Sequence, residues 1–367
     1  MAVEELKKTL VLGHRNPDTD SICSAICYAG FKHQLTGENY EPCRAGNVNP
    51  ETQYVLDYFK LKAPRLVENV KTQVKDIEIR KTKGVSRGIS LKNAWGLMQE
   101  NNVVTLPCVT EEGLLEGVIT IGDITKSYMN LYDSSIISKA CTKYANILDT
   151  LEGSMIVGDS EAYFDCGKVL IAAANPDLME NYIEKHDLVI LGNRYESQLC
   201  AIEMEAGCII VCEGAGVSLT IRKLAQERGC AVITTPYDTY TTARLINQSM
   251  PISYFMTREH LITFNSDDYI DEIREVMASK RHRDFPILDK KEQYVGTISR
   301  RNLLGIKKRR LILVDHNEKT QAVDGIGGAD ILEIIDHHRI GSLETMSPVF
   351  FRNQPLGCTA TIIYQMY

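Results

Sequence analysis

The sequence has no apolar run approaching the roughly 18 residues that a membrane-spanning helix requires. Its first ten residues, MAVEELKKTL, have no apolar centre and so do not resemble a secretory signal peptide. It also has no excess of positive charge, since 41 Lys and Arg against 48 Asp and Glu give a formal net charge of −7. That balance argues against general nucleic-acid binding. We expect a cytoplasmic protein with neither membrane nor nucleic acid as a partner.

A paired cysteine framework is also missing. The 11 cysteines are odd in number and follow no repeated spacing, which is typical of a reducing compartment where thiols are buried as small apolar groups. Two cysteine pairs have members four residues apart, Cys23/Cys27 and Cys208/Cys212. Neither lies near a second pair with finger-like spacing, so core packing is favoured over zinc binding. A chain of 367 residues is longer than one core usually serves, and we expect two to four domains.

Two segments of the chain align with each other without a gap, one starting at Leu91 and the other at Ile270. Identical residues occupy matching positions at Met98/Met277, Pro107/Pro286 and Gly117/Gly296. Each copy reads as an amphipathic helix, a short strand, a turn, a second strand and the start of another helix. Two copies of one supersecondary unit predict a pseudo-symmetric pair rather than a solenoid.

The second strand of each copy ends in the pattern G-[VT]-I-[ST]-x-x-[DN]. It places Thr120 with Asp123 in the first copy and Ser299 with Asn302 in the second. These side chains could bind ribose and phosphate, but the same residue types cap helix N-termini, and both explanations stay open. The units resemble cystathionine-β-synthase (CBS) domains, which pair to bind adenine nucleotides. This resemblance implies that the four residues contact a nucleotide, and the matched pair favours that explanation over capping.

The second copy alone contains a basic stretch, KRHRD, just before its first strand. Lys280, Arg281 and Arg283 could contact phosphates, and a solvated basic loop is an equally good explanation. Between the copies, apolar strands alternate with helices in segments such as DLVILGN, GCIIVCEG and CAVITTP, which predicts a small α/β module. By its position and pattern this module resembles the DRTGG domain that occurs between paired CBS domains.

Three apolar strands end in acidic and imidazole side chains. The strands are Thr9–Leu12, Leu311–Val314 and Ile331–Ile335, and they lead to His14, Asp18 and Asp20, to Asp315 and His316, and to Asp336, His337 and His338. Each group alone could form a turn or a cap, and we expect Ser21 to cap the helix after the first strand. Ligands of open parallel sheets lie beyond the C-terminal ends of strands, so the three groups could converge.

Crowded carboxylates repel one another and therefore need a countercharge. Mixed His and Asp ligands without thiolate suit Mn²⁺ or Co²⁺ better than a structural Zn²⁺. Two such ions about 3.5–4 Å apart would suit phosphoryl transfer to water. The ends of the chain therefore predict a dinuclear metal site.

The motifs GHRNPDTDS, VDHNE and DHH occur in this order and resemble those of the DHH phosphoesterase superfamily, the first being the form found in family II inorganic pyrophosphatases. The resemblance implies an α/β fold in which a parallel-sheet DHH domain, residues 1–65 and 308–367, is split by an inserted regulatory region. That region would contain a CBS domain at 66–132, a DRTGG-like domain at 133–248 and a second CBS domain at 249–307.

The resemblance also implies roles for the site residues. His14 and Asp18 would bind one metal ion, Asp20 and His337 the second, and Asp315 would bridge the two. His338 would contact the substrate phosphate as a catalytic general acid, and His316 and Asp336 would orient the ligands. The implied cofactors are two Mn²⁺ or Co²⁺ ions, with Mg²⁺ entering with pyrophosphate. AMP, ADP, ATP and diadenosine polyphosphates would regulate hydrolysis, and CBS pairing implies a homodimer.

The family places a further metal-binding aspartate and a basic substrate clamp beyond the point at which this sequence stops. We therefore expect a C-terminally truncated catalytic domain that retains nucleotide binding but has impaired metal binding and little or no pyrophosphate hydrolysis. Two other functions remain in competition with the pyrophosphatase reading. One is a DHH phosphodiesterase acting on short or cyclic nucleotides, and the other is a non-catalytic sensor of adenine nucleotides.

Overall fold

The computed structural model describes residues 8–129, 133–345 and 347–367. The chain divides into two compact units. One contains residues up to Arg80, Phe264–Asp289 and Thr297–Tyr367, and the other contains Lys81–Thr263 and Lys290–Gly296. In the described part of the chain, every helix is too short or too polar to span a bilayer.

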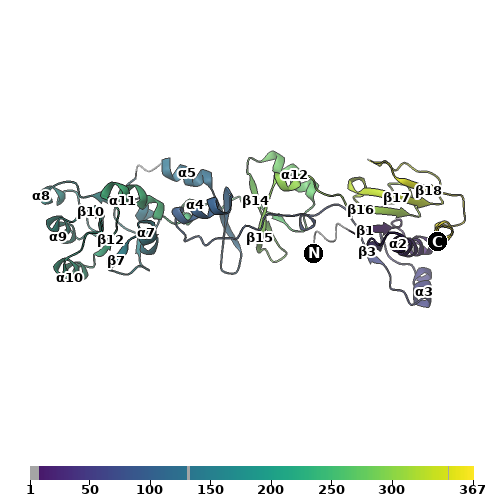
Figure 1. The fold of residues 1–367 in the computed structure, drawn as a ribbon, viewed down its shortest axis with the longest axis horizontal. Helices are drawn as coiled ribbons and strands as arrows, with labels where there is room; N and C mark the ends of the chain where they lie inside the picture. Colours follow the sequence, from purple (N-terminus) through teal and green to yellow (C-terminus); the bar gives the residue numbers. More distant parts are fainter. Residues whose placement is uncertain (1–7, 130–132, 346) are drawn as a thin grey trace. The chain divides into compact units, whose positions relative to one another are not determined.

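The first unit is built on a six-stranded sheet with the order β18-β17-β16-β1-β2-β3. Every neighbouring pair in this sheet is parallel. Its strands are β1 (Thr9–Leu12), β2 (Tyr40–Arg44), β3 (Arg65–Leu66), β16 (Arg310–Val314), β17 (Asp330–Asp336) and β18 (Phe350–Asn353). Figure 1 shows purple and yellow segments, from the two ends of the chain, side by side in this sheet, where β1 pairs with β16.

Alternation along the strands gives this sheet two apolar faces. One face carries Val11, Ile312 and Ile335, and it is covered by α2 (Thr19–Thr36) and α13 (Thr359–Tyr364). The other face carries Leu10, Leu12 and Leu313 and packs against loop residues and the short η5 (Ile326–Gly328). A further helix, α3 (Pro50–Tyr58), follows β2. Because both faces are buried, these strands read as continuous apolar runs.

The same compact unit contains most of the second repeat. Its elements are β13 (Phe264–Asn265), α12 (Ile270–Ser279), β14 (Asp284–Leu288), β15 (Tyr294–Ser299) and η4 (Arg300–Leu303). A buried ion pair, with 3.1 Å between Arg309 Nη2 and Asp76 Oδ2, joins the segment that enters β16 to η1 (Val74–Asp76). The backbone N–H of Ile270 donates to the carbonyl of Thr72, which fixes the start of α12.

The second unit is built on a five-stranded sheet with the order β7-β12-β11-β10-β9. Its strands are β7 (Ser154–Val157), β9 (Val169–Ile171), β10 (Leu188–Leu191), β11 (Cys208–Val211) and β12 (Ala231–Thr234), and only β7 is antiparallel to its neighbour. Helices and minor elements of this region are α6 (Ile136–Lys139), β6 (Thr142–Lys143), α7 (Tyr144–Thr150), β8 (Tyr163–Phe164), α8 (Pro176–Met179), α9 (Tyr195–Glu203), α10 (Leu219–Arg228), α11 (Thr239–Leu245), η2 (Ile246–Ser249) and η3 (Ile252–Tyr254).

The first repeat belongs to this second unit and contains α4 (Leu91–Glu100), β4 (Thr105–Val109), β5 (Leu115–Thr120) and α5 (Ile121–Met129). The helix and both strands of the two repeats begin and end at matching positions, with one offset throughout. The α/β class predicted from the sequence, with a parallel sheet split by an inserted region, is confirmed.

Candidate metal centre

The turn between β1 and α2 places two predicted ligands beside the end of the sheet. Asp18 is the N-cap of α2, and its Oδ1 accepts a hydrogen bond from Ser21 N at 2.9 Å. Ser21 was expected to be the cap, and this was wrong, because the helix already begins at Thr19. Ser21 Oγ instead accepts from His14 N at 3.2 Å, which holds the turn on which His14 lies.

Asp315 follows β16 directly and lies at the centre of the cluster. Its backbone has a φ of 63°, a left-handed conformation that is uncommon for a side-chain-bearing residue and recurs at functional sites. Its side chain is buried, and Oδ2 lies 3.4 Å from His14 Nε2. On the other side, Oδ1 lies 3.4 Å from His337 Nε2. Asp315 is therefore close to ligand-type side chains from both neighbouring strands.

At the end of β17, backbone acceptors and Asp336 fix the orientation of both histidines. His337 Nδ1–H donates to the carbonyl of Leu356 at 3.0 Å, and its Nε2 faces Asp315. His338 Nδ1–H donates to Asp336 Oδ1 at 2.8 Å. The same Asp336 oxygen accepts the backbone N–H groups of His337 and His338. Asp336 is fully buried, and these hydrogen bonds position His337 and His338.

The start of α13 holds the remaining carboxylate, Asp20. Asp20 accepts backbone N–H groups from Thr359 at 2.7 Å and from Ala360 at 2.8 Å. The hydroxyl of Thr359 donates to Asp315 Oδ1 at 3.0 Å. Thr359 was not predicted as a site residue, and its signal in the sequence is a hydroxyl residue at the start of an apolar helical segment. This buried residue connects α13 to two predicted metal ligands.

The electrostatics of the cluster favour a bound cation. Burial raises the pKa of the Asp315 carboxyl, and Asp20 and Asp18 raise it further, although the neighbouring His14 imidazole opposes them. Burial lowers the pKa of His14, but Asp315 and the other carboxylates outweigh burial and leave it raised. Three carboxylates thus face one small volume, and they hold a proton on the neighbouring imidazole more strongly than usual.

The donor set fits divalent metal ions. In the described part of the chain, two groups have ligand atoms close enough to share an ion, His14 with Asp18 and Asp315, and Asp315 with His337 and His338. Asp315 belongs to both groups. Its buried Oδ2 accepts no hydrogen bond from the described residues, so a metal ion would satisfy an otherwise orphaned oxygen. Asp20 lies next to the second group, with 3.8 Å between Asp20 Oδ2 and His337 Nε2.

His316 and Asn317 lie behind the cluster. His316 is buried, its Nδ1–H donates to the carbonyl of Val314 at 3.0 Å, and burial lowers its pKa to about 4. Asn317 was not singled out from the sequence as a site residue. Its Nδ2 donates to Asp336 Oδ2 and to the carbonyl of Arg339, and its Oδ1 accepts from Gly341 N. Asn317 therefore holds the loop that follows the two histidines.

The predicted nucleotide residues form helix caps in both repeats. Asp123 Oδ2 accepts from the backbone N–H of Thr120 at 2.9 Å and from its hydroxyl at 2.7 Å. Asn302 Oδ1 accepts from Ser299 in the same way, at 2.9 and 2.8 Å. The capping role that the sequence left open is therefore present in both repeats. The two pairs lie in different compact units.

The side chain of Asn302 has one further contact, since its Nδ2 donates to the carbonyl of Glu78 at 3.0 Å. It also lines a cavity of about 580 Å³ within the first unit. Capping and exposure to a cavity are compatible, because each amide or carboxylate oxygen can accept more than one hydrogen bond.

The basic stretch of the second repeat is exposed at all three predicted positions, Lys280, Arg281 and Arg283. Arg300, which the sequence analysis did not single out, donates to the carbonyls of His282, Met277 and Lys280. It thereby fixes the backbone of this stretch and leaves the basic side chains in solvent.

Family models identify the inserted region. The model for the CBS domain matches residues 74–130 and 252–309, and the model for the DRTGG domain matches residues 146–249. These matches identify the inserted region as CBS and DRTGG domains, and the chain as a whole is similar in sequence to inorganic pyrophosphatases named as cobalt- or manganese-dependent.

Individual relatives support this assignment. The chain is 40% identical to a cobalt-dependent inorganic pyrophosphatase of Clostridium perfringens, over 97% of this chain and 65% of the relative. It is 33% identical to a probable manganese-dependent inorganic pyrophosphatase of Thermotoga maritima, over 100% of this chain and 66% of that relative. The chain thus spans just under two thirds of the length of these relatives.

One solved structure covers the inserted region. It contains the CBS and DRTGG domains of the regulatory region of the Clostridium perfringens pyrophosphatase, in complex with its activator diadenosine tetraphosphate. It is 34% identical to this chain with a TM-score of 0.60, and it covers 62% of this chain and 100% of its own length.

Proposed function

We propose that the cluster at the end of the six-stranded sheet binds two Mn²⁺ or Co²⁺ ions and hydrolyses pyrophosphate to two phosphates. The observation that carries this is Asp315, a buried carboxylate whose two oxygens face separate groups of ligands. The two relatives that match nearly the whole length of this chain are named as cobalt- and manganese-dependent inorganic pyrophosphatases. When bound, such ions supply an activated water molecule and neutralise the charge of the phosphates.

The geometry supports distinct roles for the side chains. His14 and Asp18 would hold one ion, Asp20 and His337 the other, with Asp315 between them. His338 donates Nδ1–H to Asp336, so its Nε2 is free to hold or release a proton at the substrate phosphate. Asp336 orients both histidines of this strand end. His316 would support the cluster from behind, through the backbone of β16.

The inserted region would regulate hydrolysis by binding adenine nucleotides. We assign the DHH domain to residues 1–65 and 308–367, CBS domains to 66–132 and 249–307, and the DRTGG-like domain to 133–248. Thr120, Asp123, Ser299 and Asn302, with Lys280, Arg281 and Arg283, would contact AMP, ADP, ATP or diadenosine polyphosphates. Support comes from the activator bound to the corresponding Clostridium perfringens domains. We also propose a cytoplasmic homodimer, with Mg²⁺ accompanying the substrate.

Phosphate release from pyrophosphate in the presence of Mn²⁺ tests the reaction, with Asp315→Asn as the matched control. We expect the wild-type chain to release phosphate faster than this variant. Cyclic dinucleotides and short oligonucleotides are measured in parallel. Hydrolysis of these substrates without hydrolysis of pyrophosphate would overturn the proposal. Mn²⁺ binding by the wild-type chain no tighter than that by Asp315→Asn would overturn the metal site as well.

A further inference from the structure

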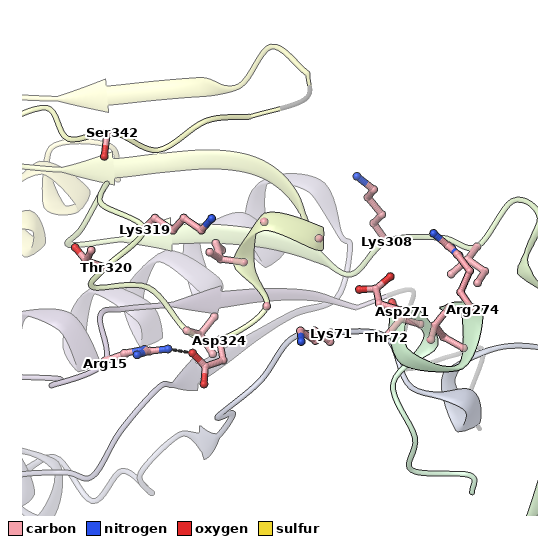
Figure 2. Close-up of a pocket in the computed structure, with 17 residues that line it drawn as sticks. Arg15, Lys71, Thr72, Asp271, Arg274, Lys308, Lys319, Thr320, Asp324 and Ser342 are labelled. Atoms are coloured by element: carbon pink, nitrogen blue, oxygen red, sulfur yellow. Dashed lines mark ion pairs between the residues drawn. The ribbon is translucent and has the colours of Figure 1, made fainter. Parts of the chain in front are cut away.

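A large cavity in the first unit lies outside the metal cluster, between the six-stranded sheet and the second repeat. It has a volume of about 870 Å³. Its wall on the sheet side comes from the turn after β1 and from residues 319–328, and its opposite wall from the start of α12 and the segment 306–308. Figure 2 shows Lys308 and Arg274 on one side of this cavity, with Lys319 and the Arg15–Asp324 pair on the other.

The lining carries an excess of positive charge. Five cationic and two acidic side chains face the cavity: Arg15, Lys71, Arg274, Lys308 and Lys319, and Asp271 and Asp324. Arg15 and Asp324 form an ion pair and neutralise each other. Among the described residues, no carboxylate lies within ion-pair distance of the other four cations. One carboxylate, Asp271, is left to balance them, so the cavity attracts anions.

The backbone on the sheet side is open to a ligand. Gly325 has a φ of 82°, and a Cβ there would lie 2.8 Å from the backbone nitrogen of Lys71, so only glycine fits. A Cβ at Gly327 or Gly328 would meet no atom within 4 Å. The peptide groups of this turn can therefore be approached directly. The hydroxyls of Thr320 and Ser342 also line the cavity.

The chemistry of the lining identifies the class of ligand. Lysine and arginine side chains, hydroxyls and glycine-rich backbone are groups that bind phosphate oxygens. The volume lies within the roughly 300–1,000 Å³ range of small-ligand sites. Among the residues that the structure describes, no aromatic side chain lines the cavity for a nucleobase to stack on. These features suit a chain of inorganic phosphates better than a nucleotide.

We propose that this cavity is a binding site for an inorganic phosphate chain, held between Lys319 on the sheet side and Arg274 and Lys308 on the other side. Arg15 follows the predicted ligand His14 directly, and Lys319 is four residues beyond Asp315. A phosphate chain in the cavity thus contacts the two loops that carry metal ligands. It also joins them to α12 of the second repeat.

Calorimetry on the full chain in EDTA tests the proposal without any contribution from hydrolysis. The probe is tripolyphosphate, and the variant is Arg274→Ala with Lys308→Ala. Both side chains are exposed, so the substitutions leave the core intact. We expect this double variant to bind tripolyphosphate about tenfold more weakly or worse, because two charged contacts are lost. Lys319→Ala, on the opposite wall, should weaken binding in the same direction.

The matched control is Lys223→Ala with Arg228→Ala on α10, which removes the same charge from exposed positions in the second unit. This control should bind tripolyphosphate as the wild type does. Equal weakening by both double variants would show a non-specific charge effect and overturn the site. Unchanged binding of tripolyphosphate by the Arg274/Lys308 variant would also overturn the site. Unfolding midpoints check that every variant is folded. Binding of ATP through Arg274 and Lys308 without binding of tripolyphosphate would overturn the identity of the ligand.

Discussion

The two parallel sheets of this protein are alike in their strands and different at their strand ends. In both, the central strands are buried, as Leu311–Val314 and Cys208–Val211 show. Both also have a left-handed residue just past a central strand, Asp315 with a φ of 63° and Glu213 with a φ of 62°. Asp315 is 1% exposed among imidazoles and carboxylates, whereas Glu213 is exposed to solvent. The comparison teaches that the chemistry of a sheet lies in the residues at its strand ends.

The largest test of this difference replaces the two left-handed acids with amides. Asp315→Asn removes the carboxylate shared by both ligand groups, so we expect Mn²⁺ affinity to fall at least about a hundredfold. Glu213→Gln makes the same chemical change at the other sheet and should leave Mn²⁺ affinity unchanged. Isothermal titration with Mn²⁺ measures both. Equal losses of Mn²⁺ affinity from the two substitutions would contradict a metal site at the six-stranded sheet alone.

Asp315→Asn has a second consequence in EDTA. Because the raised pKa of Asp315 means that folding disfavours its charged form, the neutral amide should increase the free energy of unfolding at pH 7. Urea denaturation of the metal-free chain checks this, and a less stable variant would contradict it.

A smaller effect concerns His316, which lies buried behind the metal cluster. Its pKa is lowered from 6.5 to about 4, so the unfolded chain binds a proton more readily than the folded chain between these values. Stability should therefore be lost as the pH falls from 6.5 towards 4, with a loss of about 2.5 kcal/mol at pH 4.5. His316→Asn cannot titrate and should flatten this dependence in urea denaturation of the metal-free chain. The exposed His260→Asn should leave it as in the wild type.

The next effect separates the hydroxyl of Thr359 from its backbone. Thr359→Val removes the hydrogen bond to Asp315 but keeps the backbone N–H that binds Asp20. We expect Mn²⁺ affinity to fall about tenfold, as is usual when a group that orients a ligand is lost. Thr359→Ser keeps the hydroxyl and should bind nearly as the wild type does. If Val and Ser bind Mn²⁺ equally, the hydroxyl does not position Asp315.

The smallest expected effect comes from the N-caps of two helices, one in each compact unit. Asp18 caps α2, and Ser218 caps α10 with its Oγ 3.3 Å from Ile221 N. Ser218→Ala should lower the free energy of unfolding by about 1 kcal/mol. Asp18→Asn keeps a capping oxygen and should leave the stability of the metal-free chain unchanged. A loss as large as that of Ser218→Ala would mean that the charge of Asp18, and not only its oxygen, is needed for folding.

The sequence was sufficient for the fold class because its signals are local and strong. Apolar runs such as Leu311–Val314 mark strands that are buried on both faces, and one constant offset reveals the repeat. The convergence of His14, Asp315 and His337 could be predicted because parallel strands end at the same edge. The CBS and DRTGG domains were recognised correctly.

What the sequence did not show depends on tertiary contacts. The hydrogen bond from Thr359 N to Asp20 joins residues far apart in the chain, and no sequence periodicity predicts it. Ser21 was predicted as a cap because its residue type favours that position, yet Asp18 is closer to the helix start. Arg300 could not be distinguished from the basic residues around it, since its three carbonyl partners lie on another segment.

The pairing of β1 with β16 also sets the order in which the chain can fold during synthesis. β1 leaves the ribosome early, but its neighbour on one side is translated only after the whole inserted region. Residues 81–263 can meanwhile complete their own five-stranded sheet. Until β16 arrives, β1 has an unpaired edge of the kind that invites aggregation. The six-stranded sheet, and the metal ligands at its end, should therefore form after the inserted region, with a rate set by closure of a very long loop.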